Sequence, residues 1–226
     1  APPPPTSVTQ SQPEKQGSSK KWWLLAGAGV VAGGAALVVL GKNTPPQPGT
    51  VAVSPAGKGV SGATVFTFTS QGASDKNGDT LTYSWNFGDG TAAGSGATTT
   101  HVFASAGVNS VTLTVSDGKA SVAAPAASVT VQNLNGSWKG NIYTTTCGDS
   151  WLTWTLTQSG STISGTHYDT TNGYRTISGS VSNPRAMTIT LSSGVVYAGS
   201  LNSDLTQFAG SVTGYGGGTG SFCISR

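Results

Sequence analysis

The run from Trp22 to Leu40 constrains this chain more than any other segment, because its 19 residues include no charged side chain. At about 1.5 Å per residue, a helix of that length spans roughly 28 Å, close to the hydrocarbon thickness of a bilayer. The sequence therefore predicts a single transmembrane helix, which we place at residues 20–42. The membrane is the first partner that the sequence predicts.

Lysine residues flank this helix unevenly, and the asymmetry predicts an orientation. Lys15, Lys20 and Lys21 precede the apolar run, whereas Lys42 alone follows it, after Gly41. Because positive charge collects on the cytoplasmic side of a membrane, we expect a single-pass protein of the bacterial inner membrane with a cytoplasmic N-terminus and a periplasmic remainder. The net charge of +3 arises within residues 1–43, beside the membrane, so it does not indicate a nucleic-acid partner.

The start of the apolar run suits the boundary between water and lipid, where aromatic and basic side chains gather. The predicted membrane-interface residues are Lys20, Lys21, Trp22 and Trp23. A cleaved secretory signal is the competing interpretation, since lysines before an apolar run also describe such a signal. We favour the anchor because the run is longer than the apolar region of a signal and lacks a small-x-small cleavage site before the Pro-rich stretch that follows.

Small residues recur along one side of the predicted helix and define a helix-packing face, made of Ala28, Gly29, Ala32, Gly33 and Ala36. This spacing lets another transmembrane helix approach closely. An Ala/Gly-rich anchor that contacts only lipid is the alternative, and the sequence leaves both open. Residues 1–19 have the Pro-rich, polar composition of a disordered cytoplasmic arm, and residues 43–49 that of a semi-rigid linker.

The rest of the chain has the pattern of an all-β ectodomain. Only 8% of all residues are charged, and short alternating apolar and polar stretches are separated by Gly, Asn, Asp and Ser. About 180 residues suit two small domains better than one large core. We divide them into residues 50–132 and residues 133–226.

Residues 50–132 carry a specific pattern. The stretch LTYSWNFGDG at 81–90 alternates large apolar and polar residues and then turns through Gly88, Asp89 and Gly90; the blocks THVFASAG and NSVTLTVSDG follow. These blocks resemble the polycystic kidney disease (PKD) domain family, with its W-x-F-G-D-G turn, T-H-x-F block and V-T-L-x-V strand. The resemblance implies an immunoglobulin-like β-sandwich that serves as an extracellular spacer or a protein-binding module.

The loop SDKNGDT places Asp75, Asn77 and Asp79 at alternate positions, where their oxygens could gather around calcium. The loop departs from an EF-hand, because Asn86 stands where the bidentate carboxylate would be. Some members of the PKD family bind calcium near the equivalent turn. A polar β-turn without a metal is the alternative and the one that we favour. Calcium is the one cofactor that the sequence suggests.

Residues 133–226 predict an eight-stranded antiparallel meander that closes into a small barrel. ISGTHY, ISGSVS, YAGSLN and FAGSVT each place a large apolar residue two positions before Gly, and glycine at such positions permits the strong coiling of a narrow barrel. With the opening LNGSWKG, the pattern resembles avidin and lipocalin-like barrels, from which no binding residue carries over. The expected strands are 137–144, 151–158, 161–168, 173–181, 186–192, 195–202, 206–213 and 219–225.

Both cysteines of the chain, Cys147 and Cys223, belong to this second domain. One follows the first expected strand and the other lies in the last, and these strands are neighbours in a closed meander. A disulfide there would pin the closure and suits an oxidising compartment. A metal pair or a reactive thiol lacks supporting ligands nearby.

Six aromatic residues of the barrel could line a pocket for a small apolar or carbohydrate ligand: Trp138, Tyr143, Trp151, Trp154, Tyr168 and Tyr174. We favour the alternative that aromatic side chains fill the inside of a narrow barrel. Catalysis is not expected, because the chain after the helix contains no Glu and its two histidines fall in different domains. His101 is predicted to support a turn.

The function that the sequence favours is that of a non-catalytic structural or assembly subunit of a larger inner-membrane complex. Its arm, its helix and its outer β domains would bind protein partners. A photosynthetic reaction-centre and antenna assembly is one candidate host, beside respiratory and secretion machinery. An anchored receptor that binds a small ligand or glycan in its barrel is the second hypothesis, and an envelope or adhesion protein is the third.

Overall fold

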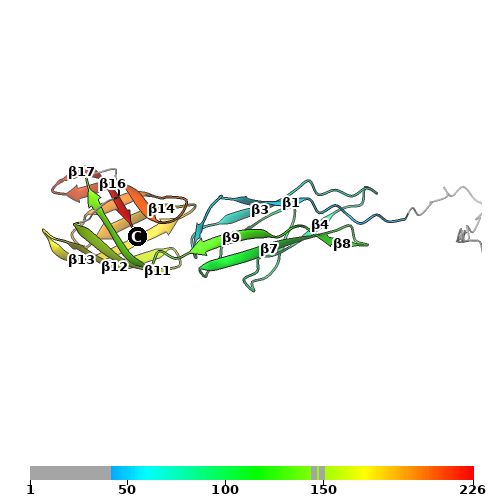
Figure 1. Ribbon diagram of the computed structural model, residues 1–226, viewed down its shortest axis with the longest axis horizontal. Helices are drawn as coiled ribbons and strands as arrows, with labels where there is room; N and C mark the ends of the chain where they lie inside the picture. The colour runs from blue at the N-terminus through cyan, green and yellow to red at the C-terminus, as the bar shows by residue number, and fades with distance from the viewer. Residues whose placement is uncertain (1–41, 144–146, 148–150) are drawn as a thin grey trace, which may run out of the picture. The chain divides into compact units, whose positions relative to one another are not determined.

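The computed structural model describes residues 42–143, 147 and 151–226, which contain strands and turns but no helix (Figure 1). Among these residues, no helix is long and apolar enough to span a bilayer. The arm and, apart from Lys42, the predicted transmembrane helix lie outside the described residues. The all-β part of the expected fold is confirmed, whereas its helical part has no support. The helix-packing and interface residues that lie outside are Lys20, Lys21, Trp22, Trp23, Ala28, Gly29, Ala32, Gly33 and Ala36.

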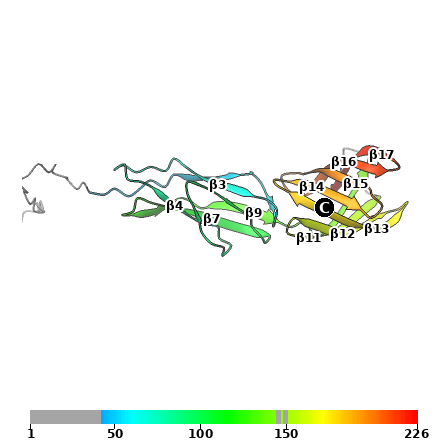
Figure 2. The ribbon, with the colours of Figure 1, turned by 180° about the vertical axis from the view of Figure 1, so that it is seen from behind.

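The first domain is a sandwich of two sheets, in which the sheet with β1 and β3 lies over the sheet with β4, β7 and β9 (Figures 1 and 2). One sheet has the order β1–β3–β6, with β1 at Thr50–Ser54, β3 at Phe66–Gln71 and β6 at Thr98–His101. The other has the order β2–β9–β7–β4–β5, with β8 paired to β7. Its strands are β2 (Gly59–Val60), β4 (Thr82–Asn86), β5 (Gly94–Ser95), β7 (Gly107–Ser116), β8 (Ser121–Ala123) and β9 (Ala127–Gln132).

Alternation along the strands builds the sandwich core, since successive side chains point to opposite faces. Trp85 on β4 and Leu113 on β7 pair across the two strands, and both are fully buried. The Trp85 Nε1–H donates to the Gly96 carbonyl at 2.8 Å, so the one polar atom of the indole is satisfied. The buried face that the sequence predicted for residues 81–90 is therefore correct.

The second domain is a closed antiparallel barrel in which each strand pairs with the next and the last pairs with the first. The eight predicted strands are confirmed, each end within two residues. The strands are β10 (Gly136–Ile142), β11 (Leu152–Ser159), β12 (Thr162–Asp169), β13 (Gly173–Ser182), β14 (Ala186–Leu191), β15 (Val196–Leu201), β16 (Gln207–Tyr215) and β17 (Gly218–Ser225).

Side chains fill the inside of this barrel. Trp154, Tyr197 and Phe222 are fully buried there, and their rings meet edge to face with centroids 4.9 Å and 5.1 Å apart. Such contacts stabilise by about 1 kcal/mol beyond the burial of area. The barrel interior is therefore a packed core, as the sequence analysis favoured.

Glycine is required where the barrel strands approach most closely. Gly199 on β15 lies opposite Gly210 on β16. A Cβ on Gly199 would stand 2.0 Å from the Ala209 carbonyl oxygen, and one on Gly210 would stand 2.1 Å from that of Ala198. The repeated glycine motif thus marks backbone contacts that no side chain can enter, which explains the pattern seen in the sequence.

Cys147 and Cys223 form a disulfide, which confirms the predicted pair. Cys223 lies on β17, and β17 pairs with β10 to close the barrel. The cross-link spans 76 residues of sequence and ties the segment after the first strand to the last strand. It stabilises the closure mainly by restricting the unfolded chain, by about 4 kcal/mol for a loop of this length.

The turns at one end of the barrel contact residues 56–65 of the sandwich. Gln158 Nε2 donates to the Ser61 carbonyl at 2.6 Å, and the Val65 amide donates to Asn183 Oδ1 at 3.1 Å. Val60 and Leu134 are buried with the barrel core. The other end of the barrel carries the turns β12–β13, β14–β15 and β16–β17.

Candidate functional site

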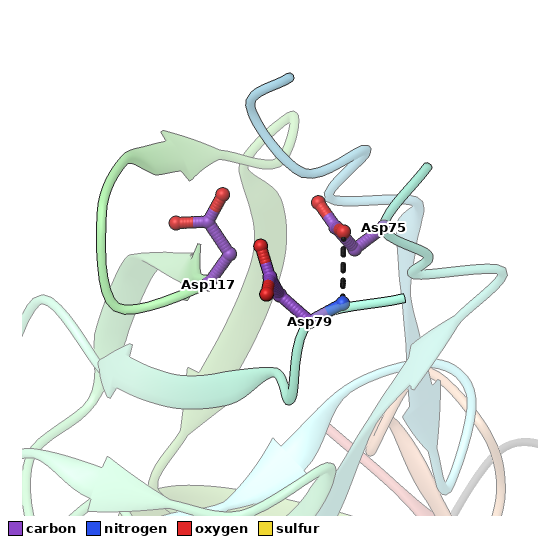
Figure 3. A group of neighbouring side chains, drawn as sticks. All are labelled: Asp75, Asp79 and Asp117. Atoms are coloured by element: carbon purple, nitrogen blue, oxygen red, sulfur yellow. Dashed lines mark hydrogen bonds between the residues drawn. The ribbon is translucent and has the colours of Figure 1, made fainter. Parts of the chain in front are cut away.

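Three carboxylates meet at one end of the sandwich, as Figure 3 shows. Asp75 and Asp79 lie on the loop between β3 and β4, and Asp117 lies in the turn between β7 and β8. One oxygen of each lies within 4.8 Å of the others. Asp117 is 7% exposed, and the other two are half-buried. The group could hold a hard cation, because carboxylate oxygens are the ligands that calcium prefers.

Backbone hydrogen bonds hold the two loops in shape. The amides of Asn77 and Asp79 donate to Asp75 Oδ1 at 2.8 and 3.0 Å, the latter drawn in Figure 3. In the facing turn, the amides of Lys119 and Ala120 donate to Asp117 Oδ1 at 2.7 and 2.6 Å. These bonds position the carboxylates before any ligand arrives, so that a cation would meet a formed site.

Asn43 and Lys119 complete the surroundings of the aspartates. Asn43 Nδ2 donates to Asp117 Oδ2 at 2.9 Å, and this bond, with the backbone bonds from Ala120 and Lys119, lowers the pKa of Asp117. Lys119 Nζ lies 2.8 Å from Asp79 Oδ2 and offsets one negative charge. Asn43 Oδ1 and Asp75 Oδ2 are buried and accept no hydrogen bond within the described part of the chain. Two buried oxygens with free lone pairs are therefore available to a cation.

The structure brings together two of the three predicted calcium ligands, Asp75 and Asp79. Asp117 stands where Asn77 was expected. Asn77 Oδ1 instead accepts a hydrogen bond from the Thr44 amide at 2.8 Å. Sequence reasoning missed Asp117, although the S-D-G-K turn was visible. The antiparallel register explains the meeting, because Thr82 at the start of β4 lies opposite Ser116 at the end of β7.

A second polar cluster supports the W-x-F-G-D-G turn. His101 Nε2 lies 2.6 Å from Asp89 Oδ2, and the His101 ring stacks on Phe87 with centroids 4.0 Å apart. Burial would raise the pKa of Asp89, but hydrogen bonds from Thr91 and His101 outweigh that effect and lower it to about 2. His101 thus supports the turn, as the sequence predicted.

The barrel contains a buried polar chain that sequence reasoning did not find. Trp154 Nε1 donates to His167 Nδ1 at 2.8 Å, and His167 Nε2 lies 3.0 Å from Asp169 Oδ2. An indole N–H can only donate, so Nδ1 accepts and the imidazole proton sits on Nε2, facing the carboxylate. Desolvation would raise the pKa of Asp169, but the bonds from His167, Asn172 and Thr171 lower it below its usual value.

A cavity of about 430 Å³ opens at the barrel end that carries the β12–β13 turn; we call it the barrel mouth. Asp169 links it to the buried chain, because the Thr171 and Asn172 amides donate to Asp169 Oδ1 at 2.9 and 2.6 Å. The lining residues are Trp151, Asp169, Thr171, Asn172, Arg175, Leu191, Ser193, Val195, Gly214 and Gly216.

The six aromatic candidates divide into two groups. Trp138 and Trp154 are fully buried in the barrel core. Tyr143, Trp151, Tyr168 and Tyr174 are exposed, and they belong to the ends of four consecutive strands at the barrel mouth. The alternation of side chains along a strand could have predicted that Tyr168 and Tyr174 face outward. Each lies an odd number of residues from a buried isoleucine on its own strand, and therefore on the opposite face.

Comparison with known proteins identifies the first domain. Residues 47–132 match the family model of the PKD domain, a range that holds the three clustered aspartates and the Asp89 turn. A search of curated proteins found no match to the chain. The resemblance to avidin and lipocalin-like proteins is not confirmed, although the closed meander barrel is. The chain therefore carries a PKD domain at residues 47–132, followed by a closed eight-stranded β-barrel.

Proposed function

We propose that this chain is a non-catalytic interaction subunit, anchored in the bacterial inner membrane by residues 22–40, with its PKD domain and barrel on the periplasmic side. The PKD domain at residues 47–132 carries the proposal, because such domains bind proteins outside the cytoplasm. The disulfide between Cys147 and Cys223 supports an oxidising compartment. The apolar run of 19 residues directly before this domain supports the anchor.

The packing of the barrel supports a structural role for the second domain. Its interior is packed with Trp138, Trp154, Tyr197 and their neighbours, as expected of a structural core. A closed barrel has no open sheet edge that could pair with other chains by accident. Such a domain can present its loops and outer surface to partners without changing shape.

The proposal is tested by extracting the native membrane with a mild detergent and identifying what co-purifies with the full chain. A stoichiometric assembly of high mass is expected, and its other subunits would name the host, whether photosynthetic, respiratory or secretory. Recovery as a lone chain in several mild detergents would contradict the subunit proposal. Release by high salt without detergent would contradict the anchor.

We also propose that Asp75, Asp79 and Asp117 bind calcium, with Asn43 Oδ1 as a neighbouring oxygen. The buried, unbonded oxygens of Asp75 and Asn43 favour this proposal over a metal-free polar turn. Calcium at about 100 times its dissociation constant would stabilise the fold by about 2.7 kcal/mol.

The calcium test compares unfolding with and without the ion in the full chain and two variants. Asp117→Asn should remove the calcium-dependent gain, whereas Asp204→Asn, an exposed residue of the β15–β16 turn, should keep it. Because each variant serves as its own metal-free reference, a direct effect of Asp117→Asn on the turn does not obscure the result. Equal gains in all three proteins would rule out this site.

A further inference from the structure

The barrel mouth combines a cavity with a concentration of exposed aromatic rings. Among the described side chains, the exposed aromatic residues are Tyr143, Trp151, Tyr168 and Tyr174, and all four lie at this end of the barrel. Trp151 is 43% exposed and lines the cavity. Exposed tryptophan and tyrosine in one place are typical of a recognition surface, because their rings offer a rigid apolar face with a polar edge.

A second pair of exposed rings lies on the outer face of β12 and β13 at this end of the barrel. Tyr168 and Tyr174 lie opposite each other on β12 and β13, with ring centroids 4.9 Å apart. Tyr174 is 75% exposed. Neither ring lines the cavity, so this pair is a separate aromatic surface at the same end of the barrel.

The polar wall of the cavity is held in place from inside the barrel. Asp169 is 3% exposed and accepts hydrogen bonds from His167, Thr171 and Asn172, so the β12–β13 turn is tied to the core. Arg175 Nη1 donates to the carbonyls of Asn172 and Tyr174 at 2.7 and 2.8 Å. A wall fixed in this way binds with little loss of conformational entropy.

The lining limits the chemistry of a ligand. Its ionisable side chains are Asp169 and Arg175, whose opposite charges leave the cavity without a net charge. A charged ligand would find no net charge to pair with, and a wholly apolar ligand would strip water from Asn172 and Arg175. A neutral ligand with an apolar face and a hydroxyl-rich edge suits both the Trp151 ring and the polar wall. A sugar ring has these two surfaces, and a volume of about 430 Å³ lies in the usual range of small-molecule sites.

From this arrangement we infer that the barrel mouth binds a short neutral glycan, with one sugar ring stacked on Trp151 and its hydroxyls facing Asn172 and Arg175. The cavity reaches the core at Leu191 and Val195, so the ligand would bind at the mouth, against the end of the packed interior. This inference goes beyond the proposed role as an interaction subunit and does not depend on which complex hosts the chain.

The test uses the full chain in a detergent that has no sugar headgroup, because an alkyl glycoside would compete for the site. Cellotetraose, chitotetraose and maltotetraose serve as neutral probes, titrated to about 10 mM while tryptophan fluorescence and saturation-transfer NMR are recorded. At least one probe should bind saturably. Trp151→Ala should weaken that binding by about tenfold or more, and Trp151→Phe should retain part of it.

Val108→Ala, an exposed apolar residue of the PKD domain, is the matched control and should bind as the unaltered chain does. Far-ultraviolet circular dichroism of each variant checks that the barrel remains folded. Arg175→Gln should also weaken binding, because it removes a charged donor from the polar wall. The inference is overturned if none of the three probes binds, if Trp151→Ala binds equally well, or if only an anionic tetrasaccharide binds. A co-purifying protein that protects Trp151 from oxidation would also overturn the inference, because the occupant of the site would then be a protein.

Discussion

Each domain of this chain pairs a histidine with an aspartate, and the two pairs differ in how they are surrounded. In the sandwich, His101 and Asp89 have side chains 14% and 17% exposed, and the imidazole stacks on Phe87. In the barrel, His167 and Asp169 are almost completely buried. The His–Asp separations are similar, 2.6 Å and 3.0 Å, so distance alone does not distinguish the pairs.

The buried pair needs a third partner that the exposed pair does without. Trp154 Nε1 donates to the second nitrogen of His167, which fixes the imidazole tautomer and leaves no polar ring atom unbonded. At the surface, water can satisfy what the protein does not. The same two residue types therefore stabilise a turn in the sandwich, where water remains. In the barrel, where water is excluded, they hold the polar wall of the cavity.

Replacing the buried histidine should have the largest effect. His167→Leu removes the partner of both Trp154 and Asp169 and leaves a buried carboxylate and a buried indole N–H without it. We expect the free energy of unfolding to fall by about 3–5 kcal/mol. Urea unfolding followed by circular dichroism measures this loss. A loss below about 1 kcal/mol would mean that water reaches the pair and that the two sites are not different in kind.

Removing the third partner alone should have a smaller effect. Trp154→Phe keeps an aromatic ring in the core but takes away the N–H donor, so His167 Nδ1 stays buried without a hydrogen bond. The unfolding free energy should fall by about 2–3 kcal/mol, from the unmet acceptor and the smaller ring together. Adding His167→Leu to this variant should cost less than it costs alone. Strictly additive losses would show that the three side chains do not act as a chain.

Lowering the pH should show how much the exposed pair, Asp89 and His101, contributes to stability. The pKa of Asp89 is about 2 in the folded protein, against 3.8 as its ordinary value, so its stabilising effect is complete above about pH 4 and is lost as pH falls toward 2. The full shift corresponds to about 2.4 kcal/mol, and screening by water at this exposed residue reduces the loss to about 1–2 kcal/mol. Asp89→Asn should flatten the stability profile over this range. An unchanged profile would indicate that Asp169, whose pKa is also lowered, or other carboxylates dominate the acid limb.

The exposed histidine should give the smallest effect and serves as the matched control for its buried counterpart. His101→Leu removes one of several hydrogen bonds to Asp89, while Thr91 still donates through its amide and hydroxyl. We expect a loss of about 1 kcal/mol in unfolding free energy. A loss equal to that of His167→Leu would remove the contrast between the two pairs.

Local sequence patterns predicted most of the fold. Period-two alternation marked each barrel strand, and the glycine repeats marked places where strands touch, as Gly199 and Gly210 do. The disulfide between Cys147 and Cys223 followed from the neighbouring first and last strands of a meander. These features depend on residues close in sequence or on a topology with one simple closure.

The candidate sites were harder to predict because they join segments that are distant in sequence. Asp117 reaches Asp75 and Asp79 only because β7 ends beside the start of β4. Trp154 reaches His167 across β11 and β12, where the register places them opposite each other. The spacing of these residues along the sequence predicts neither contact.

By itself, the sequence determined which segments form strands, which faces of those strands are apolar, and where glycine and cysteine must stand, because these follow from local sterics and periodicity. The tertiary structure decided which aromatic side chains fill the barrel and which surround its mouth. It also decided which carboxylates share one site and which histidine is sealed from water. The physical reason is that burial and the approach of distant side chains depend on strand order, register and closure, which are settled only when the whole sheet has formed.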